Sequence, residues 1–207
     1  LGPDSTICYG DSLQLLLDVS GGQGGYTYAW TPAAQLVDAT VEDPFTIPLL
    51  ASQTFVVTAT DQAGCSDLDT LVITVNPQLT IDAGADAVFC FGDSVQIGDV
   101  AGAQGGTPGY QYQWQPNLGL TTPTDSLTWV VGIDSTITYV LSVSDALGCP
   151  AVDSVTIKEN AELNVVIAPT DSFCFEETDT LIATTSGGTP GYTYQWTDPN
   201  GLLTNPT

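Results

Sequence analysis

The feature that most constrains the fold of this chain is its internal repetition. Cys8 returns as Cys90, and Trp30 returns as Trp114 at nearly the same interval along the chain. The recurring blocks are Cys-x-Gly-Asp-Ser at 8–12 and 90–94, with a looser copy at 174–178; a Gly-rich run ending in Tyr at 21–26, 105–110 and 187–192; and Gly-Cys at 64–65 and 148–149. We therefore predict three repeats, at 1–77, 78–160 and 161–207, of which the third is incomplete.

Apolar and polar residues alternate within each repeat with a period of two, which is typical of half-buried strands. In the first repeat the alternating apolar sets are Leu13, Leu15 and Leu17; Tyr26, Tyr28 and Trp30; Phe55, Val57 and Ala59; and Leu71, Ile73 and Val75. Six or seven short strands separated by Gly, Pro, Asp and Asn turns, in repeats of about 83 residues, indicate an immunoglobulin-like sandwich. The predicted fold class is all-β, with tandem β-sandwich repeats. Repeat one lacks the apolar strand that opens repeats two and three.

The charge of the chain excludes several classes of function. Lys158 is the single basic residue against 24 acidic ones, His is absent, and the net charge is -23. Binding to nucleic acid or to anionic lipid depends on clustered Lys and Arg, so neither is a direct partner. Nucleophilic triads and most general-base schemes need His or a tuned Lys, so we predict that the chain is not an enzyme.

The cysteines predict disulfides and an oxidising, extracellular setting. Each complete repeat holds two cysteines, and we predict the pairs Cys8–Cys65 and Cys90–Cys149. Cys174 would then pair with a cysteine beyond residue 207. The alternative, a zinc site, would need close CxxC pairs or histidines, and the chain has neither.

Four tryptophans are either core residues or platforms on which sugars stack. Trp30, Trp114 and Trp196 each follow two tyrosines in phase, which favours core packing. Trp129, in the segment 127–131, lies outside the repeated frame, and a core position is favoured for it too.

The motifs resemble a known family. Residues 186–196, Ser-Gly-Gly-Thr-Pro-Gly-Tyr-Thr-Tyr-Gln-Trp, are similar to the gliding-adhesin (SprB-type) repeat and to related PKD-like and immunoglobulin-like modules of Bacteroidota surface proteins. The Trp-Asp-Phe-Gly-Asp-Gly stretch of PKD domains proper is replaced by Trp-Thr-Pro at 30–32 and Trp-Gln-Pro at 114–116. The resemblance implies export by type IX secretion and a role in adhesion, gliding or the spacing of other domains.

Recurring aspartates form a candidate calcium site. Three of them, at matching positions around the cysteines of each repeat, would be drawn together if the predicted disulfides formed, and calcium takes six to eight oxygen ligands. They are Asp11, Asp61 and Asp69 in repeat one, and Asp93, Asp145 and Asp153 in repeat two. The alternative is that the residues preceding the Gly-Cys turns, and those after the first cysteines, form Asx turns. No cofactor is required by the sequence, and Ca2+ is the one candidate.

A second candidate modification follows from the resemblance. Asp followed by Ser or Thr and then an apolar residue or Thr resembles the O-glycosylation sequon of these bacteria, although strands often begin with the same pattern. The matches are Ser5, Ser12, Thr70, Ser94, Ser126, Ser135, Ser154 and Thr180.

We expect the chain to be a non-catalytic, extracellular structural or adhesive array that spaces or forms a cell-surface fibre. The alternative is a carbohydrate- or cell-surface-binding module, with or without a requirement for calcium. The expected partners are neighbouring repeats of the same long chain, a homo-oligomer or filament, and surface glycans. The third repeat would be completed either by a continuation past Thr207, which is favoured, or by strands from a neighbouring molecule.

Overall fold

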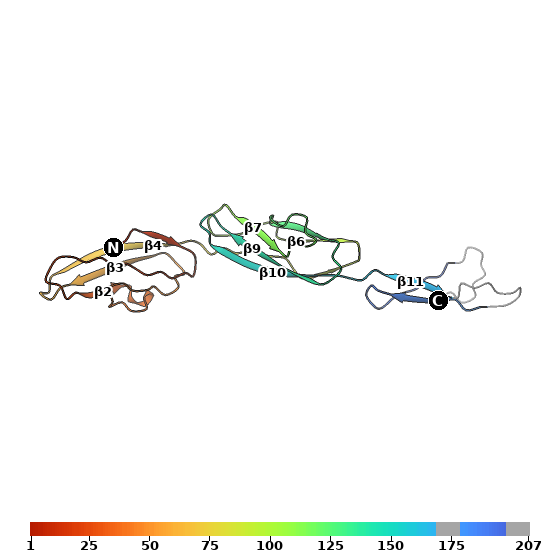
Figure 1. Cartoon of the computed structure of the whole chain (residues 1–207), viewed down its shortest axis with the longest axis horizontal. Coiled ribbons are helices and arrows are strands. Elements are labelled where there is room, and N and C mark those ends of the chain that lie inside the picture. Colours follow the sequence, from red (N-terminus) through yellow and green to blue (C-terminus); the bar gives the residue numbers. More distant parts are fainter. Residues whose placement is uncertain (169–178, 198–207) are drawn as a thin grey trace. The chain divides into compact units, whose positions relative to one another are not determined.

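The computed structural model describes residues 1–168 and 179–197. Apart from one 3-10 turn, η1 (Ala33–Gln35), the regular elements of this part of the chain are strands (Figure 1). They are β1 (Ser5–Ile7), β2 (Thr27–Thr31), β3 (Gln53–Thr60), β4 (Ser66–Val75), β5 (Ala87–Phe89), β6 (Ser94–Gly98), β7 (Gln111–Gln115), β8 (Leu127–Val131), β9 (Ile137–Ser144), β10 (Pro150–Glu159), β11 (Asn164–Ala168) and β12 (Ile182–Ser186).

These strands belong to two compact units. The first contains Leu1–Asp82, Asp99–Gln113 and Leu141–Asp153, and the second contains Ala83–Gly98, Trp114–Val140 and the described part of Ser154–Thr207. The first compact unit therefore joins predicted repeat one to two segments of predicted repeat two.

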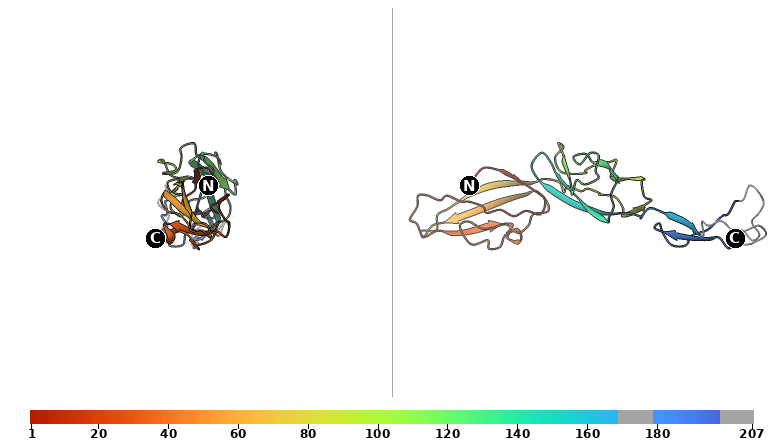
Figure 2. Two further views of the ribbon diagram at one scale, coloured as in Figure 1. Left: turned by 90° about the vertical axis from the view of Figure 1, so that its left-hand side faces the viewer. Right: turned by 45° about the vertical axis from the view of Figure 1, so that its right-hand side comes forward.

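One four-stranded sheet, in the order β1-β4-β3-β2, lies in the first compact unit (Figures 1 and 2). Strands β3 and β4 are antiparallel, and β1 runs parallel to β4 with Ile7 beside Val75. Along β4 the last three inward positions are buried and the residues between them are exposed, as the period-two pattern predicts. Because β1 is parallel to β4 and Ile7 lies beside Val75, the C-terminal ends of both strands lie at the same end of the sheet.

The core of the first sandwich lies between this sheet and a layer of short bridged segments. Gln14 bridges Phe45, and Leu36 bridges Thr46, so segments before β2 and before β3 form the facing layer. The buried core consists of Leu15, Trp30, Leu36, Leu49, Phe55, Val57, Leu71, Ile73 and Val75. Two packed layers of strands around one core make an immunoglobulin-like β-sandwich.

The strand order recurs in the next sheet, β5-β10-β9-β7, where β5 is again the short parallel edge strand. Strands β6 and β8 form a separate antiparallel pair. The equivalent tryptophans, Trp30 and Trp114, are 2% and 0% exposed, and each donates its indole N–H to a backbone oxygen, Val41 and Asp125 respectively, at 2.9 Å. Their predicted core positions are confirmed. Trp196 is half-buried, which falls short of the core position predicted for it.

The prediction that Trp129 lies in the core is wrong. On β8 the inward residues are Thr128 and Val130, at 1% and 0% exposed, so Trp129 and Val131 point outward at 45% and 40%. Thr128 occupies the buried position because its hydroxyl accepts a hydrogen bond from the Thr122 N–H at 3.0 Å. A satisfied hydroxyl lowers the cost of burying this polar side chain.

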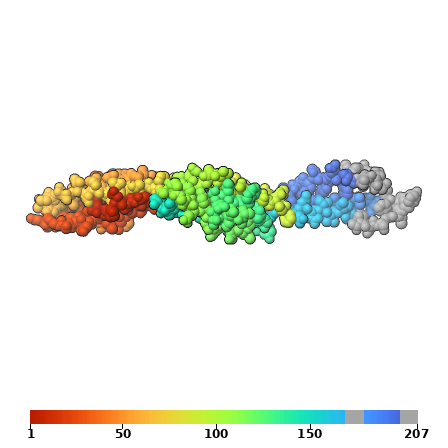
Figure 3. Space-filling model, turned by 90° about the horizontal axis from the view of Figure 1, so that it is seen from above, coloured from red at the N-terminus to blue at the C-terminus, as the bar shows by residue number. Residues whose placement is uncertain are grey.

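Strands β11 and β12 form an antiparallel pair in the second compact unit, with Asn164 opposite Ser186 and Ala168 opposite Ile182. Figure 3 shows them as adjoining blue surfaces. Leu181 and Tyr194, which flank this hairpin in predicted repeat three, are 43% and 46% exposed. In the described residues, no helix has both the length and the apolar character needed to cross a membrane.

Candidate functional site: a disulfide with an asparagine clamp

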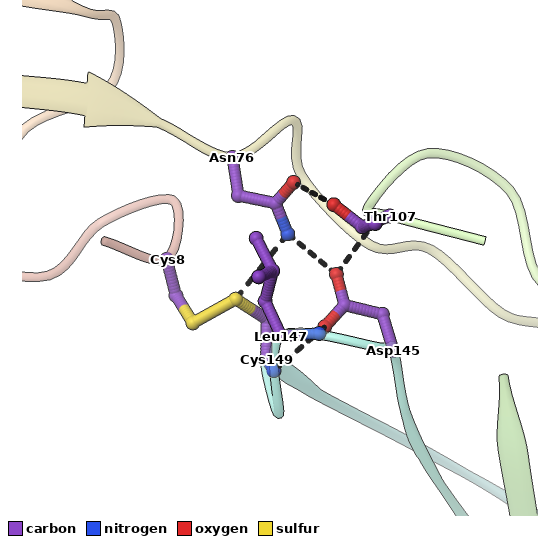
Figure 4. The surroundings of a disulfide bond; sticks show 6 residues. All are labelled: Cys8, Asn76, Thr107, Asp145, Leu147 and Cys149. Carbon is purple, nitrogen blue, oxygen red and sulfur yellow. Dashed lines mark hydrogen bonds between the residues drawn. A yellow bond between two sulfur atoms is a disulfide. The ribbon is translucent and has the colours of Figure 1, made fainter. Parts of the chain in front are cut away.

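A disulfide joins Cys8 to Cys149 inside the first compact unit (Figure 4). The two Cα atoms are 5.5 Å apart, within the usual range for a disulfide, and the cysteines are separated by 141 residues in the sequence. The bond therefore connects the first cysteine of predicted repeat one to the second cysteine of predicted repeat two. Among the described residues, Cys65 and Cys90 are exposed free thiols.

Both predicted cysteine pairs, Cys8–Cys65 and Cys90–Cys149, are wrong in the structure. Cys8 follows the end of β1, which lies beside the end of β4, whereas Cys65 immediately precedes the start of β4. Strand β4 has 10 residues, so its two ends are about 30 Å apart at ~3.3 Å per residue. Cysteines whose Cα atoms are more than about 7 Å apart cannot form a disulfide without backbone movement. The same argument separates Cys90, after β5, from Cys149, before β10.

Asn76, the first residue after β4, connects the components of this site (Figure 4). Its side chain is buried, and its amide N–H donates to Asp145 Oδ2 and to Cys149 Sγ, the latter at 3.3 Å. Its amide oxygen accepts from the Thr107 hydroxyl at 2.9 Å, and its backbone N–H donates to the Ile7 oxygen at 2.8 Å. A buried amide with each group satisfied fixes the relative position of the segments that it contacts.

Asp145 holds the turn that presents Cys149. Its Oδ1 accepts the backbone N–H groups of Leu147 and Cys149, both at 2.9 Å, and its Oδ2 accepts the Thr107 N–H at 2.8 Å as well as the Asn76 amide. Burial disfavours ionisation of this carboxyl, but these donors outweigh burial and lower its pKa below the ordinary 3.8. The group is therefore a carboxylate at neutral pH.

Gly106 allows the close approach of this carboxylate. Its φ is +58°, in the left-handed region, and a Cβ at this position would lie 2.7 Å from Asp145 Oδ2. Gly22 repeats the arrangement, with φ +59° and a Cβ that would lie 2.7 Å from Asp61 Oδ2. The Gly-Gly of the repeated motif thus leaves room for the aspartate that precedes each Gly-Cys turn.

The turn at Asp61 has the same hydrogen bonds as the turn at Asp145. Asp61 Oδ1 accepts the N–H groups of Ala63 and Cys65, both at 2.9 Å, and Oδ2 accepts the Gln23 N–H at 3.0 Å. Chiefly the Gln23 and then the Cys65 N–H lower the pKa of Asp61 below 3.8. Asp61 and Asp145 therefore form Asx turns, which was the alternative to the predicted calcium site.

The arrangement required by the calcium hypothesis is not built in the described residues, where no group of three or more Cys, His, Asp or Glu could hold a metal ion. Asp11 lies near the Cys8 end of the sheet, with its N–H donating to the Cys8 oxygen at 3.1 Å, whereas Asp61 lies at the opposite end. Asp93 repeats the Asp11 turn beside Cys90, also at 3.1 Å. Asp69, on β4, accepts the Leu1 amino group at 2.8 Å, and Asp153 lies on β10.

Most of the predicted glycosylation positions have exposed side chains. Ser5 and Ser126 are half-buried, and the exposed ones are Ser12, Thr70, Ser94, Ser135, Ser154 and Thr180. Accessibility is compatible with modification, which stays a prediction. Cys174 lies outside the described residues.

Asn76 and Thr107 were not predicted as site residues. A signal was present, because Asn76 recurs as Asn160, and Thr107 recurs as Thr189, at the interval of the repeat. Each asparagine stands at the end of a repeat and each threonine lies within a Gly-Gly-Thr-Pro motif.

Comparison with known families identifies one segment. Residues 167–201, which include the Gly-Gly-Thr-Pro-Gly-Tyr motif and Trp196, match the family described as "SprB repeat". This segment of the chain is similar to the SprB repeat. The Gly-Gly-Thr-Pro-Gly-Tyr motif of this segment also precedes Trp114, at 105–110. No curated protein sequence matches the chain.

Several solved structures are similar to this chain at low sequence identity. Three titin domains (I67–I69, an E-to-A variant) are 11% identical, over 90% of this chain and 74% of that one, with a TM-score of 0.42. The insect immune protein hemolin is 14% identical, over 76% and 45%, with a TM-score of 0.42. The PKD domain from the KIAA 1837 protein is 22% identical, over 38% and 85%, with a TM-score of 0.31.

Proposed function

We propose that this chain is a non-catalytic segment of an extracellular, cell-surface fibre or adhesin, in which disulfides between repeats carry tension. The observation that supports the proposal most directly is the Cys8–Cys149 bond. An SprB-type repeat agrees with a structural or adhesive role, and a chain without His and with one Lys has few groups for acid–base catalysis.

The covalent path explains how the bond would carry load. Tension applied at the two ends of the chain passes from Leu1 to Cys8, crosses the disulfide to Cys149, and continues along β10. Residues 9–148 lie outside this path, so force cannot extend them while the bond is intact. Each extended residue adds ~3.4 Å, so the sequence separation of 141 between the two cysteines corresponds to roughly 480 Å of length. The chain should therefore resist extension even if its sandwiches unfold.

Single-molecule stretching of the whole chain tests this proposal. The oxidised chain, held by handles at its two ends, should reach a fully extended length about 480 Å shorter than that of the Cys8→Ser variant. Cys65→Ser is the matched control, because it removes a free thiol and leaves the bond in place. Equal extended lengths for the oxidised chain and the Cys8→Ser variant would exclude the load-bearing role.

A second candidate function, recognition of glycans, is favoured by the outward position of Trp129. Trp129 and Val131 lie two residues apart on β8, on its solvent face, and together make an apolar surface on which a sugar ring could stack. Titrating the chain with surface glycans should quench its tryptophan fluorescence, and the Trp129→Ala variant should not bind. Trp30 and Trp114 are buried, so their fluorescence is the internal reference.

A further inference from the structure

Cys90, in the second compact unit, follows a short strand that pairs in parallel with a long strand, as Cys8 does. Strand β5 runs parallel to β10 with Phe89 beside Glu159, as β1 runs parallel to β4. The Asn160 N–H donates to the Phe89 oxygen at 2.9 Å, the counterpart of the 2.8 Å bond from Asn76 to Ile7. Cys90 therefore leaves its strand beside an asparagine, as Cys8 does.

The asparagine also has its threonine partner. Asn160 Nδ2 donates to Thr189 Oγ1 at 3.0 Å, and the Gly188 N–H donates to the Ala161 oxygen at 2.8 Å. In the disulfide site the amide is turned the other way, so that its oxygen faces Thr107 and its N–H faces Asp145. Asn160 thus already contacts its threonine, and its amide N–H would be the group to turn toward a carboxylate.

The Cys90 thiol itself is open to a partner. It is exposed, whereas Cys8 is half-buried and Cys149 is 4% exposed. A hollow beside it is lined by Phe89, Gly92, Ser94 and Val131. In the disulfide site, the turn that presents Cys149 supplies the second sulfur and the carboxylate, and no such turn meets Cys90 in the described residues.

We propose that Cys90 forms a second disulfide of the same kind, and that its partner is the cysteine of an Asp-x-x-Gly-Cys turn in the repeat that follows along the chain. The turn at Cys149 shows what the partner segment must contain. It is an Asx turn whose carboxylate accepts a hydrogen bond from the asparagine amide and whose cysteine lies within bonding distance of the thiol. Cys65, an exposed free thiol on the Asp61 turn, has the features that this proposal assigns to the partner cysteine.

Formation of the bond needs an oxidant of the disulfide class. The Cys90 thiolate attacks an oxidant disulfide, such as glutathione disulfide or the disulfide of a periplasmic oxidoreductase, and releases one thiol. The partner thiolate then attacks the mixed disulfide and releases the second thiol. The two cysteines lose two protons and two electrons in total, and the oxidant disulfide becomes two thiols.

The second disulfide is inferred from the structure around Cys90 and does not depend on the proposed function. Only its consequence, that tension passes from one disulfide to the next along the chain, rests on that proposal. Cys90 lies between Cys8 and Cys149 in the sequence, so the second bond would begin inside the loop that the first bond closes. Successive bonds would overlap, and every boundary between repeats would be crossed by a disulfide as well as by the backbone.

The test uses the full chain extended after Thr207 by a copy of residues 126–160, which places a copy of Cys149 at the repeat spacing. The chain is refolded in a glutathione redox buffer and its disulfides are mapped by mass spectrometry of non-reduced peptides. We expect the appended cysteine to be linked to Cys90 in at least tenfold excess over any other partner, and we expect this link to persist in the Cys65→Ser variant. Alanine in place of the appended copy of Asp145 should lower its yield several-fold.

The same map separates the inference from the proposed function. If the appended cysteine stays a thiol, or is linked to Cys65 or Cys174, while Cys8–Cys149 forms, the inference is overturned and the proposed function stands. If the Cys90 link forms and Cys8–Cys149 does not, the inference holds and the load path proposed above fails.

Discussion

The surroundings of Cys8 and of Cys90 differ in what covers them. At Cys8 the asparagine and the partner cysteine are both 4% exposed, and the asparagine amide contacts a carboxylate. At Cys90 the asparagine is half-buried and the thiol is exposed, yet the strand pairing and the backbone hydrogen bonds are the same. The comparison teaches that the strand pairing and the asparagine position the first cysteine before any disulfide forms. The turn that carries the second cysteine then buries the site and supplies the carboxylate and the second sulfur.

The largest expected difference between the two sites comes from removing their cysteines. Cys149→Ser should lower the free energy of unfolding by about 4 kcal/mol, because a bond that closes so long a loop strongly constrains the unfolded chain. Cys90→Ser should change it by less than about 0.5 kcal/mol, as an exposed thiol without a disulfide does. Denaturant unfolding followed by tryptophan fluorescence measures both, and equal losses would remove the distinction.

The asparagines should give the next largest difference. Asn76→Ala removes one donor from the buried Asp145 carboxylate and the acceptor of the Thr107 hydroxyl, and should cost about 2 kcal/mol. Asn160→Ala removes an exposed hydrogen bond to Thr189 and should cost less than about 1 kcal/mol. A loss at Asn160 as large as that at Asn76 would show that the site at Cys90 already carries the full network.

The smallest expected difference depends on pH. The pKa of Asp145 in the folded state lies below 3.8, so its contribution to stability is present above that value and is lost as the pH falls through the folded-state pKa. Acidification below about pH 4 should therefore lower the melting temperature of the chain. The Asp145→Asn variant should be less stable at pH 7 and should show a weaker acid dependence. An unchanged acid dependence would assign the effect to other carboxyls, with Asp61 the first to examine.

The sequence predicted the sandwich and its core because each rests on local patterns. Trp30 and Trp114 follow tyrosines in phase, and period-two alternation then places both indoles inside. The prediction for Trp129 was wrong because both faces of the segment 127–131 carry apolar residues. Leu127, Trp129 and Val131 share one face of the strand, but the buried face is the other one, which carries Thr128 and Val130.

The cysteine pairing could not be predicted from spacing. In a repeat array, pairing within one repeat and pairing to the next repeat use the same two cysteine positions, so equal intervals support both. The deciding fact is that β1 runs parallel to β4, which places the first cysteine at the far end of the sheet from the second. A strand as short as β1, with 3 residues, gives no sequence signal of its partner or direction. Asn76 was missed because a single polar residue after a strand is common at turns.

The loop closed by Cys8 and Cys149 also changes what a cut in the chain would do. Exposed glycine-rich turns, such as the segment 21–25, are the places where proteases most easily cleave a folded chain. A single cut between the two cysteines opens the loop but leaves both pieces joined through sulfur, so the two ends of the chain remain one molecule. A protein built in this way tolerates damage to its surface turns without losing its length.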